Sequence, residues 1–127
     1  MKIKMRFFGS LLMTIGIVLG ALGSHYFKNI LSEASLNSFE VGLRYMIYHG
    51  LGMLFISGVS FANSKTKRFV FHLFLWGTII FSGSIFLLSF KSQIPFSITW
   101  LGPITPLGGM GLIIAWILTT LEFVKKR

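Results

Sequence analysis

Residues 7–27 read FFGSLLMTIGIVLGALGSHYF and carry no acidic or strongly basic side chain. At about 1.5 Å of rise per residue, a helix over this stretch spans about 31 Å, which matches a hydrocarbon core of about 30 Å. A backbone in lipid must satisfy its own hydrogen bonds, and a run this long does so as an α-helix. The stretch therefore predicts a transmembrane helix.

Three more apolar runs follow, at residues 45–62, 69–90 and 105–124. Strands of a membrane barrel would be about half as long and would alternate in polarity, which these runs do not. Charged residues make up only 12% of the 127-residue chain, against about 25% in soluble domains. We expect an all-α protein, an integral membrane four-helix bundle, in which residues 1–127 form a single transmembrane domain.

The basic residues indicate the orientation in the membrane. Three basic clusters, within residues 2–6, 65–68 and 125–127, fall on one side if all four runs cross the bilayer. The positive-inside rule makes that side the cytoplasm, so both termini are expected there. The net charge of +9 is split among helix ends and forms no continuous face, so we expect no nucleic-acid partner. The opposite side holds only Lys28, Arg44 and Lys91.

The second run has a polar extension at its amino-terminal side. Ser32 is a candidate N-cap, and Glu33 then lies at the favourable end of the helix dipole. No proline or turn cluster separates this stretch from the run at 45–62. We therefore expect one long helix over about 33–62, whose first part, about 33–44, lies at the membrane interface.

Polar residues at membrane depth are few, and each is a candidate for function. Glu40 and Arg44 are spaced i,i+4 in the favourable order for an ion pair, and His25 is expected to arrive from the first run at a similar depth. A structural network that fixes the helix pair is the favoured interpretation, with a proton relay, a ligand site or a metal site as alternatives. The candidate polar cluster consists of His25, Glu40, Arg44, Tyr45, Tyr48 and His49.

Small residues predict where helices pack closely. In lipid, helix association depends on close backbone approach, which glycine, alanine and serine permit. These faces are expected to pack within the bundle. The predicted packing residues are Gly16, Gly20, Ser24, Gly83, Gly108, Gly109, Gly111 and Ala115.

Other kinds of site have little support. No nucleophile–base–acid constellation is present, and the absence of cysteine excludes thiolate sites. Zinc needs three or four ligands, and too few are available at one depth. Axial ligation of haem by His25 and His49 is an open alternative. We expect no metal, no cofactor and no catalytic residue.

Four sequence boxes resemble those of a known family. They are GALGSH at 20–25, FEVGLRYMIYH at 39–49, FSGS at 81–84 and TPLGG at 105–109. They are similar to boxes of the small membrane proteins of the YwdK and YgdD type, the domain of unknown function 423. The resemblance implies a four-span protein of the bacterial plasma membrane, with relatives in mitochondria and no established activity. Met46 and Phe86 depart from the family pattern, and each removes a polar group.

The expected function is that of a structural or interaction subunit of the plasma membrane. Its partners would be the lipid bilayer and other membrane proteins that contact its transmembrane helices. One alternative is a small transporter or ligand-binding protein that uses the outer-side histidine, glutamate and arginine cluster. Another is a haem-binding or enzymatic membrane protein.

Overall fold

A computed structural model describes residues 1–125. This part of the chain is helical and contains no strand, which confirms the all-α prediction. Lys126 and Arg127, which belong to the predicted basic cluster at the carboxyl terminus, lie outside the described residues. Short 3-10 helices, η1 (Phe27–Asn29), η2 (Lys91–Gln93) and η3 (Thr99–Leu101), occur in the connections. The long helices are α1 (Lys2–His25), α2 (Glu33–Gly58), α3 (Ser64–Ser89) and α4 (Ile104–Lys125).

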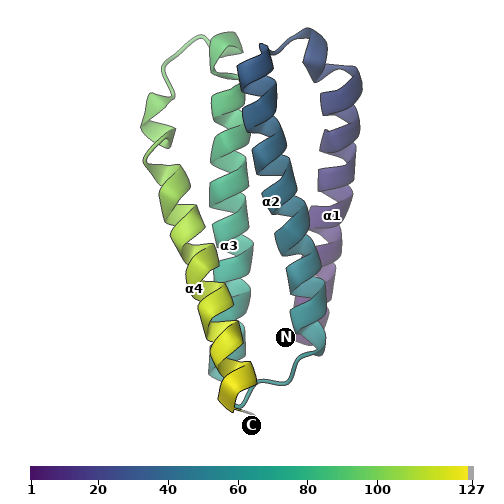
Figure 1. Cartoon of the computed structure of the whole chain (residues 1–127), viewed down its shortest axis with the longest axis vertical. Helices are drawn as coiled ribbons and strands as arrows, with labels where there is room; N and C mark the ends of the chain where they lie inside the picture. Colours follow the sequence, from purple (N-terminus) through teal and green to yellow (C-terminus); the bar gives the residue numbers. More distant parts are fainter. Residues whose placement is uncertain (126–127) are drawn as a thin grey trace.

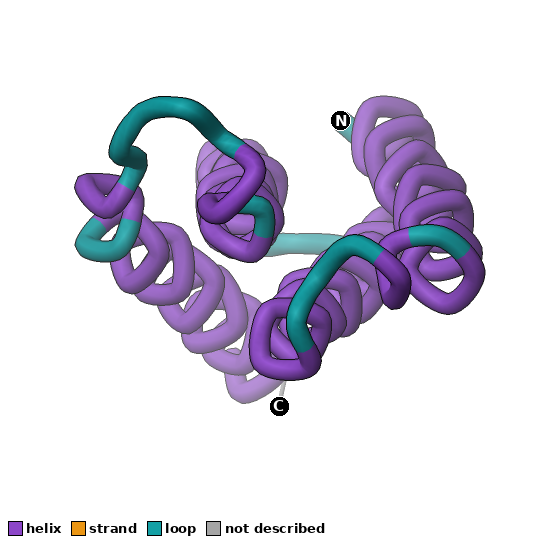
Figure 2. Tube along the Cα trace, turned by 90° about the horizontal axis from the view of Figure 1, so that it is seen from above, coloured by secondary structure: helices purple, strands orange, loops and turns teal. Residues whose placement is uncertain are grey.

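The four long helices of the described chain run alternately up and down (Figure 1). Helices that follow one another in the sequence are the closely packed pairs: α1 with α2, α2 with α3, and α3 with α4. Seen from above, they form a bent row with α1 and α4 towards its two ends (Figure 2). The start of α1, the end of α4 and the α2–α3 connection lie at the same end of the molecule (Figure 1).

Local signals in the sequence account for the helix boundaries. The Ser32 hydroxyl accepts a hydrogen bond from the Ser35 amide at 3.2 Å, as the predicted N-cap requires. The Asn63 side chain accepts one from the Lys65 amide at 2.8 Å and caps α3. α2 is continuous as expected, but it ends at Gly58 and not at residue 62, because Val59 adopts an extended conformation.

Glycine permits the closest contacts between neighbouring helices. A Cβ atom on Gly9 of α1 would lie 2.8 Å from the Gly50 carbonyl oxygen of α2. A Cβ atom on Gly108 of α4 would lie 2.5 Å from the Phe81 amide nitrogen of α3. At these two points the helix backbones themselves touch, so there is no room for any side chain.

The predicted packing residues differ in their surroundings. Gly16 and Gly20 face Ile47 and Leu43 of α2, while Ser24 is exposed and bonds back to the Gly20 carbonyl. Nothing lies within 4 Å of a Cβ atom built on Gly83. The prediction for Gly83 is therefore wrong, because this residue is on a side of α3 that no neighbouring helix covers.

The remaining predicted positions lie on α4. Ala115 is fully buried. Cβ atoms on Gly109 and Gly111 would make ordinary contacts with the Phe81 ring and with Leu73 and Gly77 of α3. These positions therefore face α3, but Gly108 is the point of closest approach.

Within residues 1–125, three helical stretches are long and apolar enough to cross a membrane: Lys2–Asn29, Ser64–Ser89 and Thr99–Lys125. α2 has the same length as α3 but is less apolar, because Arg44, His49 and two tyrosines interrupt it. Large apolar side chains are exposed on the helices, as expected for contact with lipid. Several buried polar groups bond locally or between helices; the Ser82 hydroxyl, for example, donates to the Gly42 carbonyl at 2.7 Å. The buried Thr78 hydroxyl has no hydrogen-bond partner within the described residues.

Candidate functional site

A hollow on the flank of the molecule, here called the lateral groove, lies between α2 and α4 with α3 at its base. Its volume is about 660 Å³. Most of its lining is aliphatic or aromatic, and the polar side chains are few. It is lined by Tyr45, His49, Phe81, Gly109, Leu112, Ile113, Trp116, Ile117, Thr120 and Leu121.

His49 is the most buried polar side chain of the lateral groove. Only 5% of its surface is exposed. Its Nδ1 atom lies 2.6 Å from the backbone carbonyl oxygen of Tyr45, one helical turn earlier. A carbonyl oxygen only accepts hydrogen bonds, so Nδ1 carries the proton. In the neutral ring, Nε2 is then left as an acceptor.

Aromatic rings surround this imidazole. The Tyr45 ring stacks on it with a centroid separation of 5.9 Å and an interplanar angle of 27°. The centroid of the Phe74 ring lies 5.9 Å away, and that of the Trp116 ring 6.4 Å away. The rings restrict the orientation of His49, and those of Tyr45 and Trp116 also line the groove.

Glu40 and Arg44 lie on a different face of α2. Their closest charged atoms are 3.9 Å apart, and about half of each side chain is exposed. They line a separate hollow of about 360 Å³ against Gly20, Gly23 and Ser24 of α1. The predicted ion pair is therefore present at the α1–α2 face, away from the lateral groove.

The structure does not bring the six residues of the predicted polar cluster together. Each residue of an α-helix is rotated by about 100° from the one before it, so His49 points about 140° away from Arg44. Tyr45 and His49 consequently face α3 and α4 and not α1. Tyr48 is 56% exposed, and His25 is exposed at the end of α1.

The expected common depth of His25 and His49 is also wrong. Gly50 packs against Gly9 and Leu12, near the middle of α1, whereas His25 is its last residue. The two histidines therefore differ in depth by about 20 Å. This separation is too large for both to ligate one haem. No group of three or more histidine, cysteine or acidic residues in the described chain could hold a metal ion.

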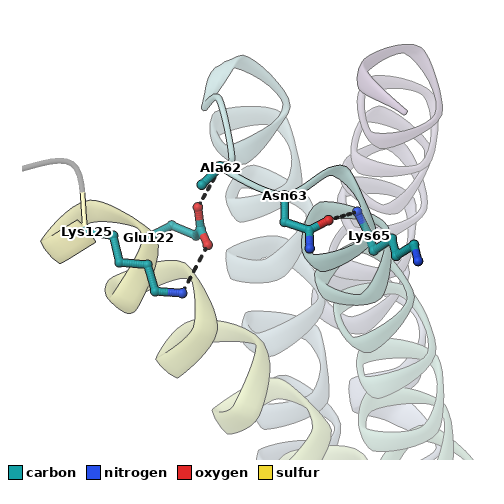
Figure 3. A network of polar contacts seen from close by, with 5 residues as sticks. All are labelled: Ala62, Asn63, Lys65, Glu122 and Lys125. Atoms are coloured by element: carbon teal, nitrogen blue, oxygen red, sulfur yellow. Dashed lines mark hydrogen bonds and ion pairs between the residues drawn. The ribbon is translucent and has the colours of Figure 1, made fainter.

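A second polar network lies at the end of the molecule where the chain termini are found, and the sequence analysis missed it. Glu122 of α4 is 2% exposed; its carboxylate accepts a hydrogen bond from the Ala62 amide at 2.8 Å and lies 3.8 Å from the Lys125 ammonium group (Figure 3). The carboxylate thus ties the end of α4 to the α2–α3 connection. An acidic residue inside the apolar run at 105–124 was the signal that could have revealed it.

Lys67 and Arg6 bond to the adjoining end of α2. The Lys67 ammonium group is buried and donates to the carbonyl oxygens of Ser57 and Val59. The Arg6 side chain donates to the Ser57 hydroxyl at 3.3 Å. The Lys67 contacts satisfy carbonyl groups at the end of α2. Together with the Arg6 contact, they connect α1, α2 and α3 at this end.

Comparisons with known proteins identify the family. The family described as "Protein of unknown function (DUF423)" matches residues 19–109. This chain belongs to the DUF423 family. Its relatives include a UPF0382 membrane protein of Staphylococcus saprophyticus, 34% identical over 92% of this chain and 93% of that protein. The UPF0382 membrane protein YwdK of Bacillus subtilis is 30% identical, with 92% and 93% covered.

A third relative matches a smaller share of the chain. A UPF0382 membrane protein of Haemophilus influenzae is 32% identical over 80% of this chain and 77% of its own length. No solved structure matches this DUF423 chain. These relatives confirm the predicted family. Together with the apolar helices, they also confirm the prediction of a multi-pass membrane protein of bacterial type.

Proposed function

We propose that this DUF423 protein is a membrane-embedded binding protein that holds a small, mostly apolar ligand in the lateral groove. The observation that carries the proposal is the groove itself. Its volume of about 660 Å³ falls within the range of about 300–1,000 Å³ that is typical of small-molecule sites. Its lining combines apolar walls with a few polar groups, as such sites do.

The role of a structural or interaction subunit has less support. That expectation depended on small-residue faces that could receive a partner helix. Gly9 and Gly16 are used against α2, and Gly108 against α3, all within the chain itself. Binding of a ligand at the groove therefore has more support than assembly through these faces.

Transport across the membrane also has less support than binding. A transporter would need a continuous polar path, and several buried hydroxyl groups already bond within their own helices. The Thr119 hydroxyl, for example, donates to the Ala115 carbonyl one turn earlier. The Glu40–Arg44 pair does not extend towards the lateral groove.

We propose further that all four helices cross the membrane, with spans at about 7–27, 69–90 and 105–124, and that both termini are cytoplasmic. The expected span at 45–62 is displaced towards the amino-terminal half of α2, because α2 ends at Gly58. α2 joins the far end of α1 to the near end of α3 (Figure 1). If α1 and α3 cross the bilayer, α2 must cross it as well. The basic clusters at 2–6 and 65–68 share one end of the molecule, which favours this orientation.

Native mass spectrometry of the full-length protein in mild detergent tests the proposed binding. Ile113 of α4 lines the groove, whereas its neighbour Ile114 does not. We expect an apolar small molecule to be retained by the wild type and by Ile114→Phe, and to be lost from Ile113→Phe, which fills the groove. Equal retention by the two variants, or no retained molecule in the wild type, would contradict the proposal.

A further inference from the structure

His49 has one ring nitrogen without a protein partner. Nδ1 donates a hydrogen bond to the Tyr45 carbonyl oxygen, and no residue in the described part of the chain bonds to Nε2. The side chain is 5% exposed and lines the lateral groove. In apolar surroundings, an acceptor that is left without a hydrogen bond is costly. The group that would pair with Nε2 is a hydrogen-bond donor located in the groove.

The depth of His49 limits what that donor can be. Its neighbour Gly50 packs against Leu12, near the middle of α1, and its ring adjoins Trp116, near the middle of α4. His49 therefore lies near the centre of the bilayer, where a charged lipid headgroup is strongly disfavoured. A neutral hydroxyl group on an otherwise apolar molecule can reach this depth at far lower cost.

The shape of the groove favours a ring beside that hydroxyl. Tyr45, Phe81 and Trp116 present aromatic rings to it, and rings of this kind attract a flat aromatic ligand through stacked or edge-to-face contacts. Ile113, Ile117 and Leu121 continue the lining along α4 for more than a turn and suit an aliphatic chain.

We propose that the ligand of the lateral groove is a lipid-soluble phenol with an aliphatic tail, the chemical class of the isoprenoid quinols, whose hydroxyl group donates a hydrogen bond to Nε2 of His49. This inference rests on the proposed function and specifies its ligand. Binding of this kind requires no electron or proton transfer. Tyr45 positions the imidazole through its carbonyl group and its ring.

Fluorescence of Trp116 provides a direct test. The protein has three tryptophans, and Trp76 and Trp100 do not line the groove. Replacing these two with phenylalanine leaves Trp116 as the only tryptophan. The probes are a decyl-chain benzoquinol kept reduced, its dimethyl ether, which keeps the ring and the tail but has no donor, and farnesol, an alcohol without an aromatic ring.

We expect the quinol to quench Trp116 saturably and to bind at least about tenfold more tightly than the ether, as loss of one hydrogen bond to a buried acceptor implies. Farnesol should bind more weakly than the quinol. His49→Phe should abolish the preference for quinol over ether, and His49→Gln, which keeps an acceptor, should retain part of it. Tyr48→Phe, on the exposed side of the same helix, should leave the preference unchanged.

Three results would overturn the inference: equal binding of quinol and ether to the wild type, a preserved preference in His49→Phe, or farnesol binding as tightly as the quinol. The first and third use only the wild-type groove and do not depend on the folding of a His49 variant.

If ether and quinol bind equally and Ile113→Phe weakens both, the proposed function stands and only the hydroxyl contact fails. If no probe binds the wild type and native mass spectrometry detects no retained molecule, both proposals fail.

Discussion

At the scale of single residues, the depth and partner of each polar side chain decide its role. Glu40 and Arg44 form a half-exposed pair on the α1 side of α2. Glu122 is nearly fully buried and bonds to the backbone of another segment. Exposed ion pairs contribute about 0–1 kcal/mol, whereas a hydrogen bond to a charged group contributes about 1.5–3 kcal/mol.

Replacement of Glu122 should therefore destabilise the protein more than replacement of Glu40. Glu122→Ala leaves the Ala62 amide without its acceptor and frees the end of α4 from the α2–α3 connection. We expect a loss of about 1–3 kcal/mol, measured by thermal unfolding of the full-length protein in detergent. Glu40→Ala is the matched control. Equal melting temperatures for the two variants would show that the Glu122 contact is not important for stability.

At the scale of helices, close backbone contact determines which faces meet. α3 and α4 approach most closely at Gly108, where even a methyl group would lie 2.5 Å from a backbone nitrogen. α1 and α2 do so at Gly9 and Gly50. Since lipid supplies little hydrophobic force between helices, these contacts are what keep each pair together.

A pair of alanine substitutions distinguishes packed from unpacked glycine. Gly108→Ala must separate α3 from α4, because the obstructing atoms belong to the backbone, and overpacking of this kind costs about 1–3 kcal/mol. Gly83→Ala meets no neighbour and should be neutral or stabilising by up to about 1 kcal/mol, since alanine favours helix more than glycine does. Melting curves in detergent measure both. A more harmful effect at Gly83 than at Gly108 would contradict this arrangement of α3 and α4.

At the scale of the whole molecule, the four long helices of the described chain form a bent row in which sequence neighbours are also neighbours in space (Figure 2). This arrangement leaves α2 and α4 on either side of a groove with α3 beneath it. The connections are too short to form a separate domain outside the membrane. The proposed ligand would therefore reach the groove from the lipid.

Labelling of single cysteines tests the proposed orientation, because the chain has no native cysteine. Ser64 is the first residue of α3 and Ser97 lies in the connection that follows α3; both are exposed, and they lie at opposite ends of that helix. In intact cells, an impermeant thiol reagent should label Ser97→Cys and should not label Ser64→Cys until the cells are opened. Labelling of Ser64→Cys from outside would reverse the topology.

Much of the fold could be predicted from the sequence because the relevant signals are local. Apolar runs as long as the bilayer is thick give the number and approximate position of the helices. Ser32 fixes the start of α2 through a hydrogen bond three residues away. The Glu40–Arg44 pair needs only helical spacing. The family boxes are also properties of the chain alone.

Only the tertiary structure decided which way each helix faces and at what height it packs. Both depend on contacts between residues far apart in the sequence. The packing of Gly50 against Gly9 and Leu12 sets the depth of His49, and the rotation of α2 turns that histidine towards Trp116 and away from Arg44. The periodicity of apolar residues within one helix cannot specify how that helix is rotated relative to its neighbours, because most faces of such a helix are apolar. The lateral groove and the burial of Glu122 follow from those rotations.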